Sequence, residues 1–139
     1  NLLNMSRRLS TVYAQQIEAY RTAQNTNENM SGRDIEAAAL TRCALMLSAC
    51  QNNWNAVGRD VHLSEALRNN QMVWSILQSE LANDDNPLPI EVRNNLLTLS
   101  VFIDKRIIDV MASPAPEKLQ ILIDINLNLA AGLRGSAAG

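Results

Sequence analysis

Apolar residues recur at intervals of three and four along most of the chain, which is the period of an amphipathic helix. The polar run at residues 25–29 is expected to end the first such helix, which we place at residues 6–25. Ser31, with Asp34 three positions later, has the pattern of an N-cap and predicts the start of a second helix. The apolar stripe of the first helix consists of Leu9, Val12, Tyr13, Ile17 and Tyr20.

Stripes of the same period predict three more helices, and Gly58 lies in the connection between the second and the third. We expect these stripes to form the core, with Trp74 between the third and fourth helices. Four methionines, at positions 30, 46, 72 and 111, are also expected to fill the core. The second stripe is Leu40, Cys43, Leu47, Cys50 and Trp54, the third is Leu63, Leu67, Val73, Trp74, Leu77 and Leu81, and the fourth is Val92, Leu96, Leu99, Ile103, Ile107 and Val110.

Proline-containing segments mark the two clearest breaks in this pattern. Residues 83–87 read Asn-Asp-Asp-Asn-Pro, and each of these residue types disfavours both helix and strand. Pro89 suits the first turn of the fourth helix, because a backbone N–H needs no helical partner there. The two prolines in residues 113–116 are expected to end that helix, since neither can lie in a helix interior.

The last apolar segment, residues 119–129, fits two different periods. Its aliphatic side chains occupy every second position, which is the period of a strand. We predict a helix that ends near Gly132, because the chain offers no second strand and an isolated strand leaves its backbone without partners. Such a segment must be buried, since it is apolar on almost every side. The face that fits a helix consists of Leu119, Leu122, Asn126, Leu129 and Leu133.

These elements predict an all-α protein, a single-domain bundle of about five helices. A chain of 139 residues is long enough to bury one core. We place the domain at residues 6–133 and expect residues 1–5 and 134–139 to be loose termini.

Charge and cysteine usage favour a cytoplasmic protein. The net charge of −2 gives no electrostatic reason to expect nucleic acid or an anionic membrane as the partner. No apolar run approaches the roughly 20 residues that span a bilayer, and the N-terminus lacks the apolar region of a signal peptide. Cys43 and Cys50 lie about 10 Å apart on one predicted helix, too far for a disulfide, so we expect two reduced thiols.

The residue inventory does not predict an enzyme, a metal site or a cofactor. His62 is the only histidine, and a lone histidine is more often a surface or capping residue than a catalytic base. Together with Cys43 and Cys50 it matches no common zinc spacing, and a fourth ligand is missing. No glycine-rich loop precedes a helix, so a phosphate-binding loop of the familiar kinds is not expected.

Three short motifs in the second half of the chain occur in a specific order and together resemble the FlaF family of flagellar biosynthesis regulators. The first is W-x-x-L, the second is L-P-x-x-V-R, and the third is L-I-D-I-N followed by G-L. Each motif is weak alone, and the resemblance depends on their order and spacing. The residues that carry it are Trp74, Leu77, Leu88, Pro89, Arg93, Leu122, Ile123, Ile125, Asn126 and Gly132.

The resemblance implies a small helical cytoplasmic protein that is required for flagellin production and export. FlaF-like proteins are linked with flagellin as secretion chaperones, and with FlbT in controlling flagellin synthesis. A flagellin chaperone would cover the apolar face of an amphipathic flagellin segment by a helix-in-groove contact. The alternative is a post-transcriptional regulator of flagellin mRNA that acts with FlbT, which would need a basic surface with stacking aromatic residues.

The first helix is the candidate edge of such a groove. Tyr13, Ile17 and Tyr20 lie on one side of it, and a tyrosine at a groove rim offers both an apolar ring and a hydroxyl. The alternative is that this helix only completes the bundle.

Overall fold

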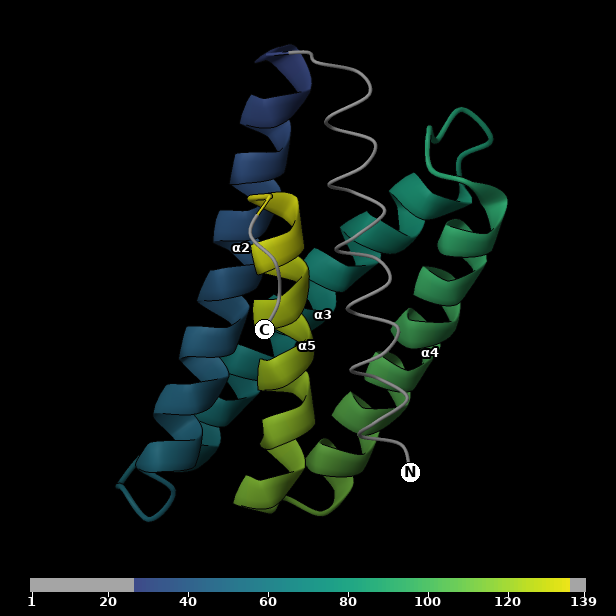
Figure 1. The fold of residues 1–139 in the computed structure, drawn as a ribbon. Helices are drawn as coiled ribbons and strands as arrows, with labels where there is room; N and C mark the ends of the chain where they lie inside the picture. Colours follow the sequence, from purple (N-terminus) through teal and green to yellow (C-terminus); the bar gives the residue numbers. More distant parts are fainter. Residues whose placement is uncertain (1–26, 136–139) are drawn as a thin grey trace.

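The computed structural model describes residues 27–135, and within this range all regular secondary structure is helical (Figure 1). The helices are α2 (Asn27–Asn52), α3 (Arg59–Ala82), α4 (Ile90–Ala112) and α5 (Gln120–Leu133), with a short 3₁₀ helix, η1 (Pro116–Leu119), between the last two. The predicted all-α fold is confirmed. The described range holds four α-helices of the five expected, and the first expected helix, residues 6–25, lies outside it.

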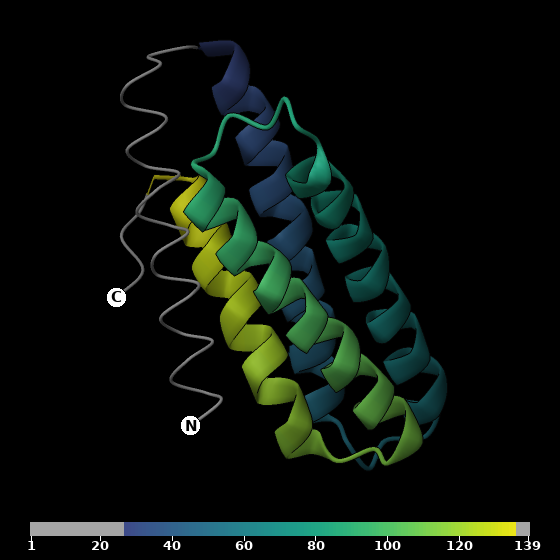
Figure 2. The ribbon, with the colours of Figure 1, turned by 90° about the vertical axis from the view of Figure 1, so that its right-hand side faces the viewer.

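Successive α-helices run in opposite directions and form a bundle (Figure 1). Turned by a quarter, the bundle shows α4 nearest the viewer, between α5 and α3, with α2 behind (Figure 2). The Gln51 side-chain amide donates a hydrogen bond of 3.1 Å to the Pro116 carbonyl, which joins the end of α2 to η1. Helix α5 therefore starts beside the last turn of α2 and packs along it.

Helix α5 confirms the helical interpretation of residues 119–129. Its exposed residues, Gln120, Leu127 and Arg134 just past its end, recur every seven positions and form one narrow stripe. The rest of the surface of α5 is largely buried, so aliphatic residues are favoured on several sides of the helix. Their occurrence at every second position is therefore a coincidence and does not indicate a strand. The buried residues are Ile121, Leu122, Ile123, Ile125, Asn126, Leu129, Ala130, Gly132 and Leu133.

Helix α2 starts earlier than the sequence indicates. Its described part already includes Asn27, inside the polar run 25–29, whereas the N-cap was expected at Ser31. The run contains neither glycine nor proline, and its residue types cost at most about 0.7 kcal/mol each in a helix. The position of Gly58 is as expected: its φ of 82° lies in the left-handed region that glycine adopts readily, and α3 follows directly.

The turn between α3 and α4 is closed by hydrogen bonds from its asparagines. The Asn83 side-chain oxygen accepts from the Asp85 backbone N–H, and the Asn86 side chain donates to the Glu80 carbonyl, both at 3.0 Å. The Arg93 guanidinium donates to the Asn83 carbonyl at 2.9 Å, which ties the first turn of α4 to the end of α3. Pro89 stands directly before α4, close to the first-turn position expected for it.

The core is formed by the predicted stripes with few exceptions. All six stripe residues of α4 are buried, as are those of α2 apart from Trp54 and those of α3 apart from Val73. Trp54 is half-buried beneath Arg59, whose guanidinium carbon lies 4.2 Å from the ring centroid. The expectation that the methionines fill the core is wrong for Met72 and Met111, which are exposed because they lie on the outer sides of α3 and α4.

Candidate partner-binding site

A buried hydrogen-bonded chain joins two of the family-like motifs. The Trp74 indole N–H, on α3, donates to the Asn126 side-chain oxygen of α5 at 2.8 Å. The Asn126 amide then donates to the Asn70 side-chain oxygen at 2.7 Å. Each of the three side chains is at most 1 % exposed. Trp74 is therefore a core residue as predicted, and its polar atom reaches α5.

The direction of this chain follows from the chemistry of its first member. An indole nitrogen can only donate, so the Asn126 oxygen must face Trp74 and the Asn126 nitrogen must face Asn70. This leaves the Asn70 nitrogen as the end of the chain, and it is buried without a hydrogen-bond partner. An unpaired buried amide is costly, so the network specifies how α3 and α5 pack more than it adds stability.

The remaining motif residues are mainly structural as well. Pro89 is exposed and Arg93 is half-buried in the turn that precedes and opens α4. The other members lie inside the bundle, so the motifs describe the fold of the α3, α4 and α5 region and not an exposed surface. The buried members are Leu77, Leu88, Leu122, Ile123, Ile125 and Gly132.

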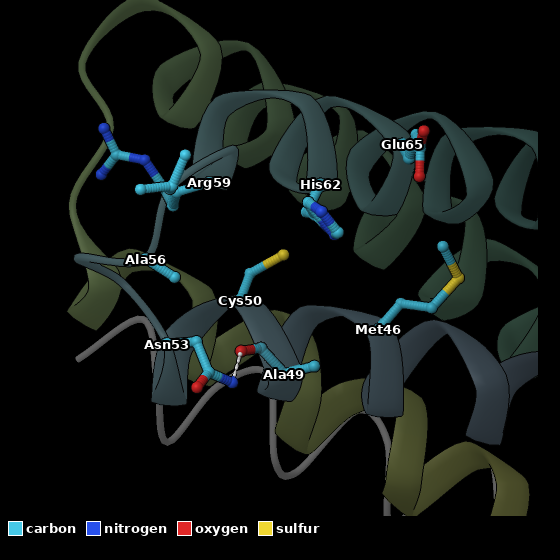
Figure 3. A pocket seen from close by; sticks show the side chains of 9 residues that line it. Met46, Ala49, Cys50, Asn53, Ala56, Arg59, His62 and Glu65 are labelled. Atoms are coloured by element: carbon cyan, nitrogen blue, oxygen red, sulfur yellow. Dashed lines mark hydrogen bonds between the residues drawn. The ribbon is translucent and has the colours of Figure 1, made fainter.

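A concave site lies where α2 ends and α3 begins (Figure 3). It is a pocket of about 360 Å³ between the last turns of α2 and the first turns of α3. This volume is within the range of small-molecule and side-chain binding sites. The pocket, which we call the α2–α3 pocket, is lined by Met46, Ala49, Cys50, Asn53, Ala56, Val57, Arg59, His62 and Glu65.

The α2–α3 pocket has an apolar floor and a polar rim. Met46, Ala49 and Cys50 come from α2, and the Cys50 sulfur points toward the side on which His62 lies (Figure 3). His62 and Glu65 come from α3 and line the opposite wall. A buried apolar centre inside a polar rim is the arrangement found where one protein receives a large side chain of another.

Three features of the last turns of α2 and the segment that follows shape this pocket. Gly58 turns the chain through a positive φ, and the His62 backbone N–H then donates to the Gly58 carbonyl at 3.1 Å. The Arg59 guanidinium binds Asp60 at 2.9 Å and lies over Trp54, so it is held away from the pocket floor. Ala49 and Ala56 leave the space that larger side chains would fill.

The thiols are not activated as nucleophiles. Burial, with the Glu65 charge second, raises the pKa of Cys50, so the thiol beside His62 stays protonated at neutral pH. Burial also raises the pKa of Cys43 to about 11, and the Asn69 amide donates to its sulfur at 3.4 Å. Both cysteines are free, as predicted. His62 is exposed in the first turn of α3, as expected of a surface residue.

A second feature of the α2–α3 contact is the carboxyl group of Glu36, whose pKa is raised by burial. Burial first, and the Glu80 charge second, raise the pKa of Glu36 to about 7 from a reference of 4.5, against a smaller opposite effect of Arg33. Because the folded state binds this proton more tightly, the associated stability is complete below about pH 4.5 and is lost as the pH rises to about 7.

We therefore expect Glu36→Gln to raise the melting temperature at pH 8 and to leave it nearly unchanged at pH 4, where the carboxyl is protonated in both states. Thermal unfolding followed by circular dichroism at the two pH values measures this. Glu91→Gln, a change of an exposed carboxylate on α4, is the control. A Glu36→Gln variant with the same effect at both pH values would contradict the assignment.

The binding residues expected from the sequence, Tyr13, Ile17 and Tyr20, lie outside the described residues, and their role stays a prediction. The α2–α3 pocket was not found from the sequence. Its signal is a set of small residues, Ala49, Ala56 and Gly58, where the α2 stripe runs out. Among residues 27–135, no cluster of three or more histidine, cysteine, aspartate or glutamate side chains is arranged to hold a metal ion.

Within the described range, each helix is too short or too polar to cross a lipid bilayer. In comparison with protein families, a model described as flagellar protein FlaF matches residues 16–133. The match extends across both halves of the chain, whereas the three motifs lie in the second half. Neither the curated proteins nor the solved structures contain a match.

Proposed function

Since the chain belongs to the FlaF family of flagellar proteins and thus has a flagellum-related function, we propose that it is a cytoplasmic flagellin chaperone. In this role it binds an amphipathic flagellin segment and promotes the synthesis and export of flagellin. FlbT is a further candidate partner in the same pathway. The observation that supports a binding role most directly is the α2–α3 pocket, an apolar cavity of about 360 Å³ with a polar rim.

Beyond the pocket, exposed apolar side chains recur along α2 and α3, and we call this line the seam. The contact between Cys43 and Asn69 sets the register of these antiparallel helices. In that register, Ile35 of α2 and Ile76 of α3 lie at the same height, and both are exposed. Met46 lies on the same side of α2 as Ile35, eleven residues further on, so the seam is about 17 Å long.

A partner helix of about three turns would span this seam. One large apolar side chain would fill the pocket, and a second, about eleven residues away, would contact Ile35 and Ile76. The rim groups Asn53, His62 and Glu65 would face polar residues along the edges of that helix. Terminal flagellin segments, disordered before assembly and amphipathic once ordered, have the required pattern.

The described residues give less support to RNA as the partner. Stacking of bases needs exposed aromatic rings. In the described range Trp74 is buried, Trp54 is half-buried beneath Arg59, and Phe102 is half-buried with the Arg106 guanidinium carbon 5.7 Å from its ring centroid.

Filling the α2–α3 pocket is expected to weaken flagellin binding without unfolding the protein. Ala49 is exposed and lines the pocket, so the larger side chain of Ala49→Leu occupies space that the partner needs. We expect a tenfold or greater loss of flagellin affinity, about 1.4 kcal/mol, in isothermal titration of the purified full chain with monomeric flagellin.

The matched control is Ala82→Leu, the same change at an exposed alanine at the end of α3, away from the pocket and from Ile76. It is expected to keep wild-type affinity, and both variants should retain the wild-type unfolding free energy within about 0.5 kcal/mol. Equal affinities of the two variants would exclude the pocket as the site. A wild-type chain that does not bind flagellin would overturn the proposed function itself.

A further inference from the structure

Helix α4 is apolar on two opposite sides. Its inner side is formed by the predicted stripe and is buried in the bundle. On its outer side Ile90, Val101 and Ile108 are 58 %, 49 % and 65 % exposed, and Leu97 between them is half-buried. A helix that packs only on its inner side normally has a polar outer face. Figure 2 shows α4 nearest the viewer among the described helices, and the exposed fractions of these residues place the second face toward solvent.

The outer residues of α4 follow a self-complementary spacing. Ile90, Leu97, Val101 and Ile108 are separated by seven, four and seven residues, so they form one straight stripe of the kind found in coiled coils. The stripe is about 27 Å long and is symmetric about position 99. When two copies of α4 lie antiparallel, Ile90 faces Ile108 of the second copy, and Leu97 faces Val101.

The charges beside the stripe fit the same arrangement. Arg93 and Asp104 lie along the same edge of the stripe. In the antiparallel pair, Arg93 of one copy lies beside Asp104 of the other, and the two positions differ by only about 1.5 Å along the helix axis. In a parallel pair Arg93 would lie level with Arg93 of the second copy, and Asp104 with Asp104, and such like charges repel.

Both groups have polar atoms available for this contact. The Arg93 guanidinium donates to the Asn83 carbonyl through Nη1, which leaves Nη2 for a second acceptor. Asp104 accepts from the Gln78 amide through Oδ2 at 3.0 Å, which leaves Oδ1 for a second donor.

We propose that the outer face of α4 binds a second copy of this chain, as an antiparallel two-fold contact in which the same stripe meets itself. A single such patch closes a dimer, because a two-fold contact uses the same surface on both subunits. The α2–α3 pocket lies on other helices, so self-association through α4 leaves it accessible to flagellin. This inference does not depend on the proposed function.

Sedimentation equilibrium of the full chain over a series of concentrations tests the proposal. The wild-type mass is expected to rise from that of the 15.3 kDa chain toward twice that value. Ile108→Lys places a charge in the stripe and is expected to weaken the dimer by roughly tenfold or more. Ile76→Lys, the same change at a 55 % exposed isoleucine of α3, is expected to leave the dimer intact and to weaken flagellin binding.

A mass of 15.3 kDa at every concentration would overturn the proposal. If such a monomer also lost flagellin binding through Ile108→Lys, the outer face of α4 would belong to flagellin instead. An Ile76→Lys variant that dissociates as readily as Ile108→Lys would equally overturn the assignment to α4.

Disulfide trapping tests the orientation. Ile90→Cys and Ile108→Cys are each made alone and then mixed under mild oxidation, with Cys43 and Cys50 buried in both. A mixed disulfide between the two variants, without self-coupling of either, is the expected result for the antiparallel pair. Self-coupling of each variant alone would show a parallel contact and overturn the proposal.

Discussion

Replacing Trp74 with alanine lowers the free energy of unfolding by about 3–5 kcal/mol, the range for large buried aromatic side chains. The side chain is 1 % exposed, so its removal leaves a cavity between α3 and α5. It also removes the N–H that the Asn126 oxygen accepts, and this oxygen then stays buried without a partner. Urea unfolding followed by circular dichroism gives the change directly.

Two variants separate the contributions to this effect. Trp74→Phe keeps most of the ring but loses the donor, so it is expected to cost about 1–3 kcal/mol. Trp54→Ala removes a half-buried tryptophan and is expected to cost less than half as much as Trp74→Ala. If Trp74→Ala kept the wild-type stability but lost flagellin binding, Trp74 would be a binding residue and its place in the core would be wrong.

The second large effect is expected for Asn126→Asp, a change of a single group within the same buried network. A carboxylate in this position is desolvated, and it can no longer donate to the Asn70 oxygen as the amide does. The expected loss at pH 7 is about 3–5 kcal/mol, as for an uncompensated buried charge.

The loss should depend on pH. Burial raises the pKa of the introduced carboxyl in the folded state above its value of about 3.9 in the unfolded chain. The variant is therefore nearest to wild-type stability below about pH 4, where the protonated carboxyl can donate to Asn70, and loses stability as the pH rises. Unfolding free energies at pH 4 and pH 7 measure this, with Asn94→Asp at an exposed position of α4 as the control. A loss that does not change with pH would show that the buried charge is not its cause.

The fold was largely predictable because the helix-breaking segments and the apolar stripes indicate the same helices. The segments around Pro87 and Pro114 end helices for reasons of backbone chemistry alone, and the α4 stripe buries six residues as expected. Residues 119–129 could be assigned to a helix only through the absence of a second strand, since their alternation is compatible with both periods. Their burial on most sides depends on tertiary packing, which cannot be derived from the spacing of apolar residues along the sequence.

The network and the surfaces were harder to infer. Asn70 stands in a polar stretch that resembles a solvated helix face, and it is buried because α5 brings Asn126 to it. The apolar pattern of the outer residues of α4, such as Val101 and Ile108, is weaker than the inner stripe of the same helix, so the sequence did not reveal it. Met72 was assigned to the core by residue type, although its helical position places it outside.

The candidate binding site also depends on packing that the sequence does not show. From the sequence we predicted Tyr13, Ile17 and Tyr20 as binding residues, and these lie outside the described residues. The α2–α3 pocket depends on which side chains are small where the two helices meet, and Ala49 and Ala56 both line it. A cavity of this kind cannot be derived from a stripe on one helix.

We propose that this FlaF-family protein binds monomeric flagellin and delays its assembly. The direct measurement is polymerisation of purified flagellin, seeded with filament fragments, in the presence of increasing amounts of the full chain, with complex formation followed by size-exclusion chromatography. We expect a stable complex and a delay that grows with the concentration of the chain, and a weaker delay with Ala49→Leu than with Ala82→Leu. Unchanged polymerisation with no complex would contradict it.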